Sequence, residues 1–335
     1  MPPSPARGVR GNTLVFGLGA VLALCCASLI FGYQAMTPLQ MINALTLYEA
    51  SNAMHVIFVD IRLPRMATAA VAGAALGAAG ALLQSMTRNP LADPGILGVN
   101  AGAALGVVLS IVILGVTDPA RYVWTALTSC LLVSAVVFLI GGRQNTNPTR
   151  LLIAGAAVMA VSLAIIRAIL LLSRQTLDTY RFWVLGGLDG ASFETLAALM
   201  PFLAVGCVLA VICSFWLNGL ALGEDAAKGL GLRTGLAQVL TACAVVLLCG
   251  ATVSMVGPVA FVGLVAAHLA RPFAQADAKW LLALSAPFGA ALLLAADLLG
   301  RLPLFGGGMQ AGVTSALIGG PVLIWLIWRK GALRQ

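Results

Sequence analysis

The chain has 335 residues, of which 61% are hydrophobic and only 9% are charged, and its formal net charge is +8. Soluble domains carry about 25% charged residues, so a chain this poor in charge could not cover a water-facing surface. The composition therefore predicts an integral membrane protein. The basic residues are scattered among apolar runs, which argues against a nucleic-acid partner.

Apolar segments recur along the whole chain. Runs of about 20 residues without period-two alternation predict spanning helices and exclude a barrel. We predict an all-α membrane protein with one transmembrane domain over residues 1–335, an uncleaved first span and about ten transmembrane helices. The pair Gly257-Pro258 should divide residues 235–270 into a full helix and a short one. The expected spans are about 13–33, 66–86, 95–116, 122–141, 150–172, 195–217, 236–256, 258–270, 280–297 and 312–328.

The distribution of Lys and Arg predicts the orientation. If both ends of the chain are cytoplasmic, the inner segments carry about twice as many Lys and Arg residues as the outer ones. This bias places the turn after the second span, TRNPLADPG at 87–95, on the inner side. Its two prolines explain why one helix stops there before the next begins.

The motif DIRLPR, which begins at Asp60, precedes the second expected span and puts Arg62 and Arg65 on the outer side. Two arginines there oppose the usual bias of membrane proteins. With Arg301 they could form a basic patch that binds carboxylates of a soluble partner. Anchoring to lipid headgroups, or ion pairs with Asp60 or Asp297, would explain the same residues.

Glycines recur at a spacing of four residues, which keeps them on one face of a helix. Gly73 and Gly77 show this spacing in the second span, and Gly98, Gly102 and Gly106 show it in the third. In lipid such faces allow two helix backbones to approach closely. The pattern predicts close packing but does not identify the partner helices.

The most charged inner segment is LGEDAAKGLGLRTG, at 222–235. Glu224 and Lys228 stand four residues apart with the acid first, which is the favourable order on a helix. Gly229 and Gly231 should end that helix. A docking lever and a solvated loop are both compatible with this pattern.

Arg167 lies inside the fifth expected span, toward its outer end. Charged residues within membranes usually face a cavity or a partner. An anionic cargo could bind it there, or its long side chain could reach the outer interface instead.

The chain lacks the motifs of an energy-coupled machine. It contains neither a GxxxxGK[ST] phosphate loop nor an HExxH zinc motif. No Asp or Glu lies in the middle of an expected span, where proton-driven transporters usually keep one. The sequence thus indicates a conduit driven by another protein, with no catalytic residues, metal site or cofactor of its own.

Six motifs stand in order along the chain: RLPR, TRNPLADPGILGVNAG, RFWVLGG, LGEDAAKGLG, GPVAFVGLVAAHLAR and IGGPVLIWLIWRK. Together they resemble the FecCD family of ABC-importer permeases, from about residue 55 to residue 330. One departure is Ala267, which stands where the family usually has proline before the histidine.

The resemblance implies a type II ABC-importer permease fold in the inner membrane, with both termini cytoplasmic. It implies a second permease subunit, identical or a sibling, two cytoplasmic ATP-binding subunits and a periplasmic substrate-binding protein. The implied cargo is a ferric siderophore, with haem or cobalamin as the alternative. A stand-alone secondary transporter and a membrane-embedded enzyme are the remaining classes.

The resemblance also assigns roles to residues. It implies docking of the binding protein by Arg62, Arg65 and Arg301, and it raises the case for Arg167 as a pathway residue. It implies ATPase coupling by Leu222, Gly223, Glu224, Asp225, Ala226, Lys228, Gly229, Leu230 and Gly231, and a cytoplasmic gate of Asn89, Leu91, Asn147, Pro148 and Thr149.

Overall fold

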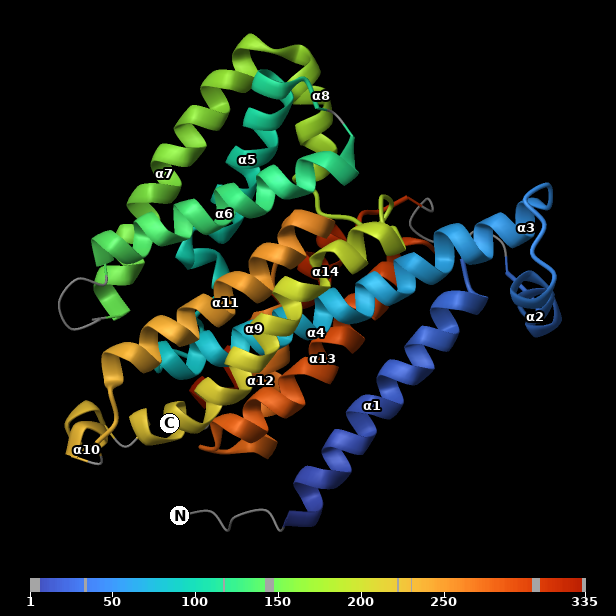
Figure 1. Ribbon diagram of the computed structural model, residues 1–335. Coiled ribbons are helices and arrows are strands. Elements are labelled where there is room, and N and C mark those ends of the chain that lie inside the picture. The colour runs from blue at the N-terminus through green and yellow to red at the C-terminus, as the bar shows by residue number, and fades with distance from the viewer. Residues whose placement is uncertain are drawn as a thin grey trace.

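A computed structural model describes residues 7–32, 35–116, 118–141, 148–221, 223–229, 231–302 and 308–332. In these ranges every regular element is a helix (Figure 1). The helices are α1 (Arg7–Ile30), α2 (Pro38–Thr46), α3 (Ala53–Val56), η1 (Ile57–Arg62), α4 (Leu63–Thr87), η2 (Pro94–Leu97), α5 (Val99–Leu114), α6 (Pro119–Gly141), α7 (Pro148–Leu172), α8 (Arg174–Trp183), α9 (Phe193–Leu220), α10 (Glu224–Gly229), α11 (Thr234–Val256), α12 (Val262–Ala274), α13 (Ala278–Gly300) and α14 (Ala311–Ala332).

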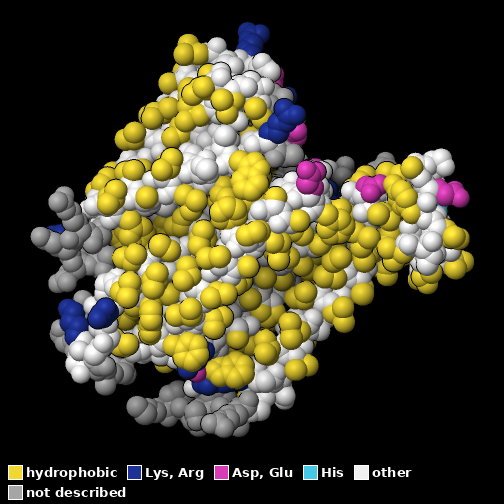
Figure 2. Space-filling view, in the orientation of Figure 1, with side chains coloured by type: hydrophobic (Ala, Val, Ile, Leu, Met, Phe, Trp, Pro, Cys, Tyr) yellow, Lys and Arg dark blue, Asp and Glu magenta, His cyan; other side chains and the backbone are white. Residues whose placement is uncertain are grey.

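In the described part of the chain, 7 helical stretches are long and apolar enough to cross a membrane, judged by length and composition. They are Gly8–Ile30, Ala53–Thr87, Arg121–Gly141, Arg150–Leu172, Phe193–Leu220, Thr234–Val256 and Ala278–Gly300, and the shorter apolar helices are Val99–Leu114, Val262–Ala274 and Ala311–Trp325. Hydrophobic side chains cover most of the face shown in Figure 2. The chain is an all-α, multi-pass membrane protein.

Helices α4 and α11 form the centre of the bundle. In the most apolar 18-residue segment of each helical stretch, 72% of the residues are buried, against 11% in α1 and 17% in α7. The sequence of α4 explains its place, because Ala and Gly surround the helix on every side and let α11, α12 and α13 approach it. Helices α1 and α7 instead expose apolar surface, as expected for contact with lipid or another subunit.

The structure identifies the partners of the closely spaced glycines. A Cβ atom at Gly77 would overlap the Ser285 carbonyl on α13, and one at Gly73 would overlap the backbone of Gly289. The pair Gly102 and Gly106 lies in the same way against the backbone of α6. Backbone-to-backbone contact of this kind requires glycine at these positions.

The helix that carries RLPR begins earlier than residue 66, where the second span is expected to start. Helix α3 continues through the π-helical turn η1 into α4, so the stretch from Ala53 to Thr87 is unbroken. In η1, Leu63 N donates to Phe58 O, five residues back. The wider π turn accommodates a proline near the start of α4, since proline has no N–H to place. Both arginines of RLPR therefore project from a helix.

The short eighth apolar helix is displaced from its expected range. It starts at Val262 and ends at Ala274, after a non-helical break that follows α11. Gly257 (φ +73°) and Phe261 (φ +67°) bound this break, both with positive φ. The Gly-Pro pair therefore ends α11, as expected, but three more residues follow it before α12 begins at Val262.

Candidate functional site

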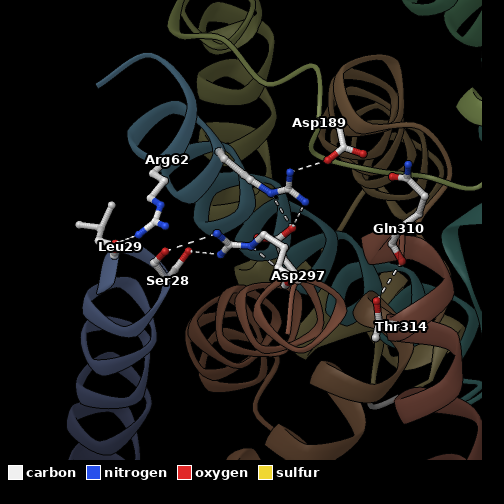
Figure 3. A network of polar contacts seen from close by, with 9 residues as sticks. Ser28, Leu29, Arg62, Asp189, Asp297, Gln310 and Thr314 are labelled. Carbon is white, nitrogen blue, oxygen red and sulfur yellow. Dashed lines mark hydrogen bonds and ion pairs between the residues drawn. The ribbon is translucent and has the colours of Figure 1, made fainter. Parts of the chain in front are cut away.

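Asp297 lies at the centre of a charged cluster at the α3 end of the bundle (Figure 3). Its side chain is 1% exposed and belongs to the last turn of α13. Its Oδ1 accepts from Arg65 Nε at 2.9 Å and lies 2.8 Å from Arg65 Nη2. Its Oδ2 lies 3.0 Å from Arg301 Nε. One buried carboxylate thus holds two of the three arginines that the sequence singled out.

Each of these two arginines has a second partner. Arg301 Nη2 donates to Ser28 Oγ on α1 at 2.7 Å. Arg65 Nη1 pairs with Asp189, which lies between α8 and α9 and whose side chain is 60% exposed. Burial lowers the pKa of the Arg301 guanidinium and the nearby Asp297 offsets only part of this, but arginine stays cationic.

The third arginine, Arg62, is buried and points toward α1. Its Nη1 donates to the carbonyls of Leu29 at 2.6 Å and Ile30 at 3.2 Å, at the C-terminal end of that helix. A cation there satisfies carbonyls that lack helical partners and favours the helix dipole. Arg62 thus stabilises the end of α1 in this structure.

The three arginines line one cavity of about 230 Å³, together with Asp189. Around it, three arginines face two aspartates, which leaves one positive charge in excess. Such a site can bind the carboxylate of another molecule by charge-assisted hydrogen bonds. The geometry therefore joins the residues that were grouped from sequence, although each already has a partner within the chain.

Sequence reasoning missed part of this cluster. Asp297 was considered as an alternative partner, and its spacing of four residues from Arg301 on one helix is a usable signal. Ser28 and Asp189 carry no such signal, because each lies far from its arginine along the chain.

At the other end of the bundle, the turn after α4 contacts the end of α9. Arg88 ends α4 in the left-handed region at φ 50°, and its guanidinium donates to the Leu220 carbonyl. Asn89 Oδ1 accepts from the backbone N of Leu91 at 2.9 Å, which closes a tight turn. The Leu91 side chain is exposed. The turn predicted as a gate is therefore closed by an internal hydrogen bond, and it lies beside the helix that leads into α10.

The second predicted gate segment lies at the start of α7. Pro148 and Thr149 are its first two residues, while Asn147 lies outside the described residues. Helix α7 packs on η2, where Gly155 approaches the Ile96 carbonyl. Asp93 caps η2 through the backbone N of Gly95, and burial raises the pKa of its carboxyl while that bond lowers it. Helix α7, which begins with the second predicted gate segment, thus contacts η2, which follows the first one in the chain.

The predicted coupling segment forms the short helix α10. Ala227 is buried against the core, whereas Ala226 and Lys228 are exposed. Leu232 N donates to the Ala227 carbonyl at 3.0 Å and Gly231 N donates to the Lys228 carbonyl at 2.9 Å. Helix α10 thus presents one face outward. Leu222 and Leu230 lie outside the described residues, as do the side chains of Glu224 and Asp225.

Arg167 is separate from the arginine cavity. It lies on α7, and its side chain is exposed while that of Ile166, its neighbour, is buried. It therefore faces away from the core of this chain, toward whatever surrounds α7.

Comparisons with known proteins give consistent matches. The model of a family described as the FecCD transport family matches residues 20–329. The chain is 38% identical over 314 residues to the probable siderophore transport system permease protein YfiZ of Bacillus subtilis, covering 93% of this chain and 94% of that protein. It is 40% identical over 318 residues to the ferric enterobactin transport system permease protein FepD of Escherichia coli, covering 94% of each.

A solved structure of a transporter is similar to this chain in fold. This is a metal-chelate type ABC transporter in an inward-facing conformation, with a TM-score of 0.76 and 25% identity over 95% of this chain and 99% of that one. The matched sequence range includes all three arginines of the cavity.

Proposed function

This chain belongs to the FecCD transport family and is a membrane transport permease, and we propose that it carries a ferric siderophore inward as the permease subunit of an ATP-driven importer. The observation that carries the proposal is the arginine cavity at one end of a bundle that presents the short helix α10 at the other. A partner that delivers cargo and a partner that supplies energy would then bind at opposite ends. Alternating access between the two ends would move the cargo.

The cargo proposal rests on relatives named for siderophore transport. Haem or cobalamin in the same role is the second candidate. A stand-alone secondary transporter is less well supported, because the buried acid at the end of α13, Asp297, is bound by two arginines and is not available to carry a proton.

The charge bias supports a definite orientation and assembly. With both termini and α10 in the cytoplasm, the arginine cavity faces the periplasm, where the carboxylates of a binding protein can reach it. We infer an inner-membrane assembly of two permease subunits, identical or siblings, two ATP-binding subunits and the binding protein. The exposed apolar faces of α1 and α7 provide surface for the second subunit and for lipid.

The cargo is tested by reconstitution with the partner proteins. Proteoliposomes containing this permease, its ATPase and its binding protein should accumulate a radiolabelled ferric siderophore when ATP is present. Haem and cobalamin, supplied under the same conditions, should accumulate much less. Uptake that persists without the ATPase would identify a secondary transporter, and preferential uptake of haem or cobalamin would identify the second candidate.

The coupling role of α10 predicts a second result. Substituting the exposed Ala226 by glutamate should reduce ATP-dependent uptake by roughly 10-fold or more, because the added charge would lie at the contact with the ATPase. The thermal stability of the permease alone should not change. Co-purification of the ATPase and its hydrolysis rate would be measured with uptake. Normal uptake and hydrolysis would place the coupling contact on another segment.

A further inference from the structure

The loop that carries Asp189 contacts the end of α11, the break before α12 and the start of α14. Gly187 N donates to the Val256 carbonyl at the end of α11, and Gly312 N at the start of α14 donates to the Gly186 carbonyl, both at 2.8 Å. A Cβ atom at Gly186 (φ +66°) would overlap the Pro258 carbonyl in the break before α12. We call this meeting of Gly186, Gly187, Val256, Pro258 and Gly312 the glycine junction.

Asp189 lies two residues beyond the glycine junction, and its carboxylate pairs with Arg65 on α4. This ion pair therefore connects the arginine cavity to the end of α11, the break before α12 and the start of α14. The same loop also lines a second cavity of about 480 Å³ with Val256, Gly257 and Gln310. A change at Arg65 can thus reach the glycine junction through one short stretch of backbone.

The two aspartates bind different parts of the Arg65 guanidinium. Asp297 takes Nε and Nη2 from within the bundle, whereas Asp189 takes only Nη1 from the exposed side. A pair in a buried site is costly to break, while an exposed pair is weak and screened by salt. Arg65 can therefore release Asp189 and remain held by Asp297.

We propose that Asp189 occupies Arg65 only while no binding protein is docked, and that a carboxylate of the docked protein displaces it and frees the glycine junction. The inference rests on the proposed function, because it requires a binding protein whose acidic side chains enter the arginine cavity. Asp297 acts as a positioning residue that keeps Arg65 in place throughout the exchange. Docking would thereby be communicated to α11, α12 and α14 without movement of α4.

The exchange is tested by titrating the binding protein against the complete permease–ATPase complex in lipid nanodiscs. Substituting Asp189 by asparagine removes the internal competitor, so the affinity for the binding protein should rise by up to about fivefold. Hydrolysis of ATP without the binding protein should also rise, because the loop that carries Gly186 and Gly187 is no longer tied to Arg65.

Asp178→Asn is the matched control. Asp178 lines the same 480 Å³ cavity, its side chain is 62% exposed, and it pairs with Arg181 rather than Arg65. The Asp178→Asn substitution removes the same charge as Asp189→Asn, and it should change neither the affinity for the binding protein nor the hydrolysis of ATP. An equal effect of the two substitutions would reveal a general charge effect and overturn the exchange.

Arg65→Gln separates this inference from the proposed function. It should weaken docking, and adding Asp189→Asn to it should then have no further effect on affinity. Undiminished docking by Arg65→Gln alone would overturn the docking role of the cavity itself. If Arg65→Gln weakens docking but Asp189→Asn alone brings no gain in affinity, the docking role of the cavity stands and the exchange is overturned. A gain in affinity without a rise in basal hydrolysis would overturn the release of the junction.

Discussion

Substituting Asp297 by alanine is expected to destabilise the folded permease by about 3–5 kcal/mol, because a buried ion pair that loses one partner leaves uncompensated charge. Arg65 and Arg301, both largely buried, would lose the carboxylate that they share. The midpoint of unfolding of the purified permease in detergent, followed by size-exclusion chromatography after heating, measures this effect.

Two variants make that result specific. Asp118→Ala removes an exposed acid that pairs with Arg121 at 3.8 Å, and it should change stability by less than about 0.5 kcal/mol. Combining Asp297→Ala with Arg301→Leu removes one of the orphaned charges and should restore part of the loss. An unchanged midpoint for Asp297→Ala would show that the cluster contributes nothing to stability.

The all-helical fold could be predicted because the lipid bilayer around the chain requires it. A chain with 9% charged residues and long apolar runs must satisfy its backbone within helices. Glycine spacing predicted which helix faces pack closely, yet the partners α13 and α6 could not be predicted. Which helix fills a glycine face depends on the whole arrangement of the bundle rather than on either local pattern.

The site shows the same division between local and distant information. Arg62, Arg65 and Arg301 could be grouped from sequence because basic residues on the predicted outer side break a known bias. Asp189 could not be assigned to Arg65, since 124 residues separate them and only the folded loop brings them together. The π-helical turn before Pro64 was also missed, because proline near an apolar run usually indicates a helix start.

Valine at Gly77 is expected to cost about 3 kcal/mol or more, because its side chain would be forced into the backbone of α13. The Cβ position already overlaps the Ser285 carbonyl, and α4 can move away from α13 only by giving up part of its packing against α11 and α12. The expected result is a large loss of folded, monodisperse protein in detergent.

Gly19→Val on α1 provides the control, since no atom beyond its own turns of helix lies within 4 Å of its Cβ position and the change in helix propensity is the same. It should leave the yield and the unfolding midpoint nearly unchanged, and equal losses for the two variants would attribute the effect to propensity rather than packing.

Gly77 also lies about 18 Å along α4 from Arg65, whose partner Asp297 is on α13. A Gly77→Ala variant that still folds should therefore shift the two helices apart and weaken docking of the binding protein, because the close α4–α13 contact keeps Arg65 and Asp297 aligned.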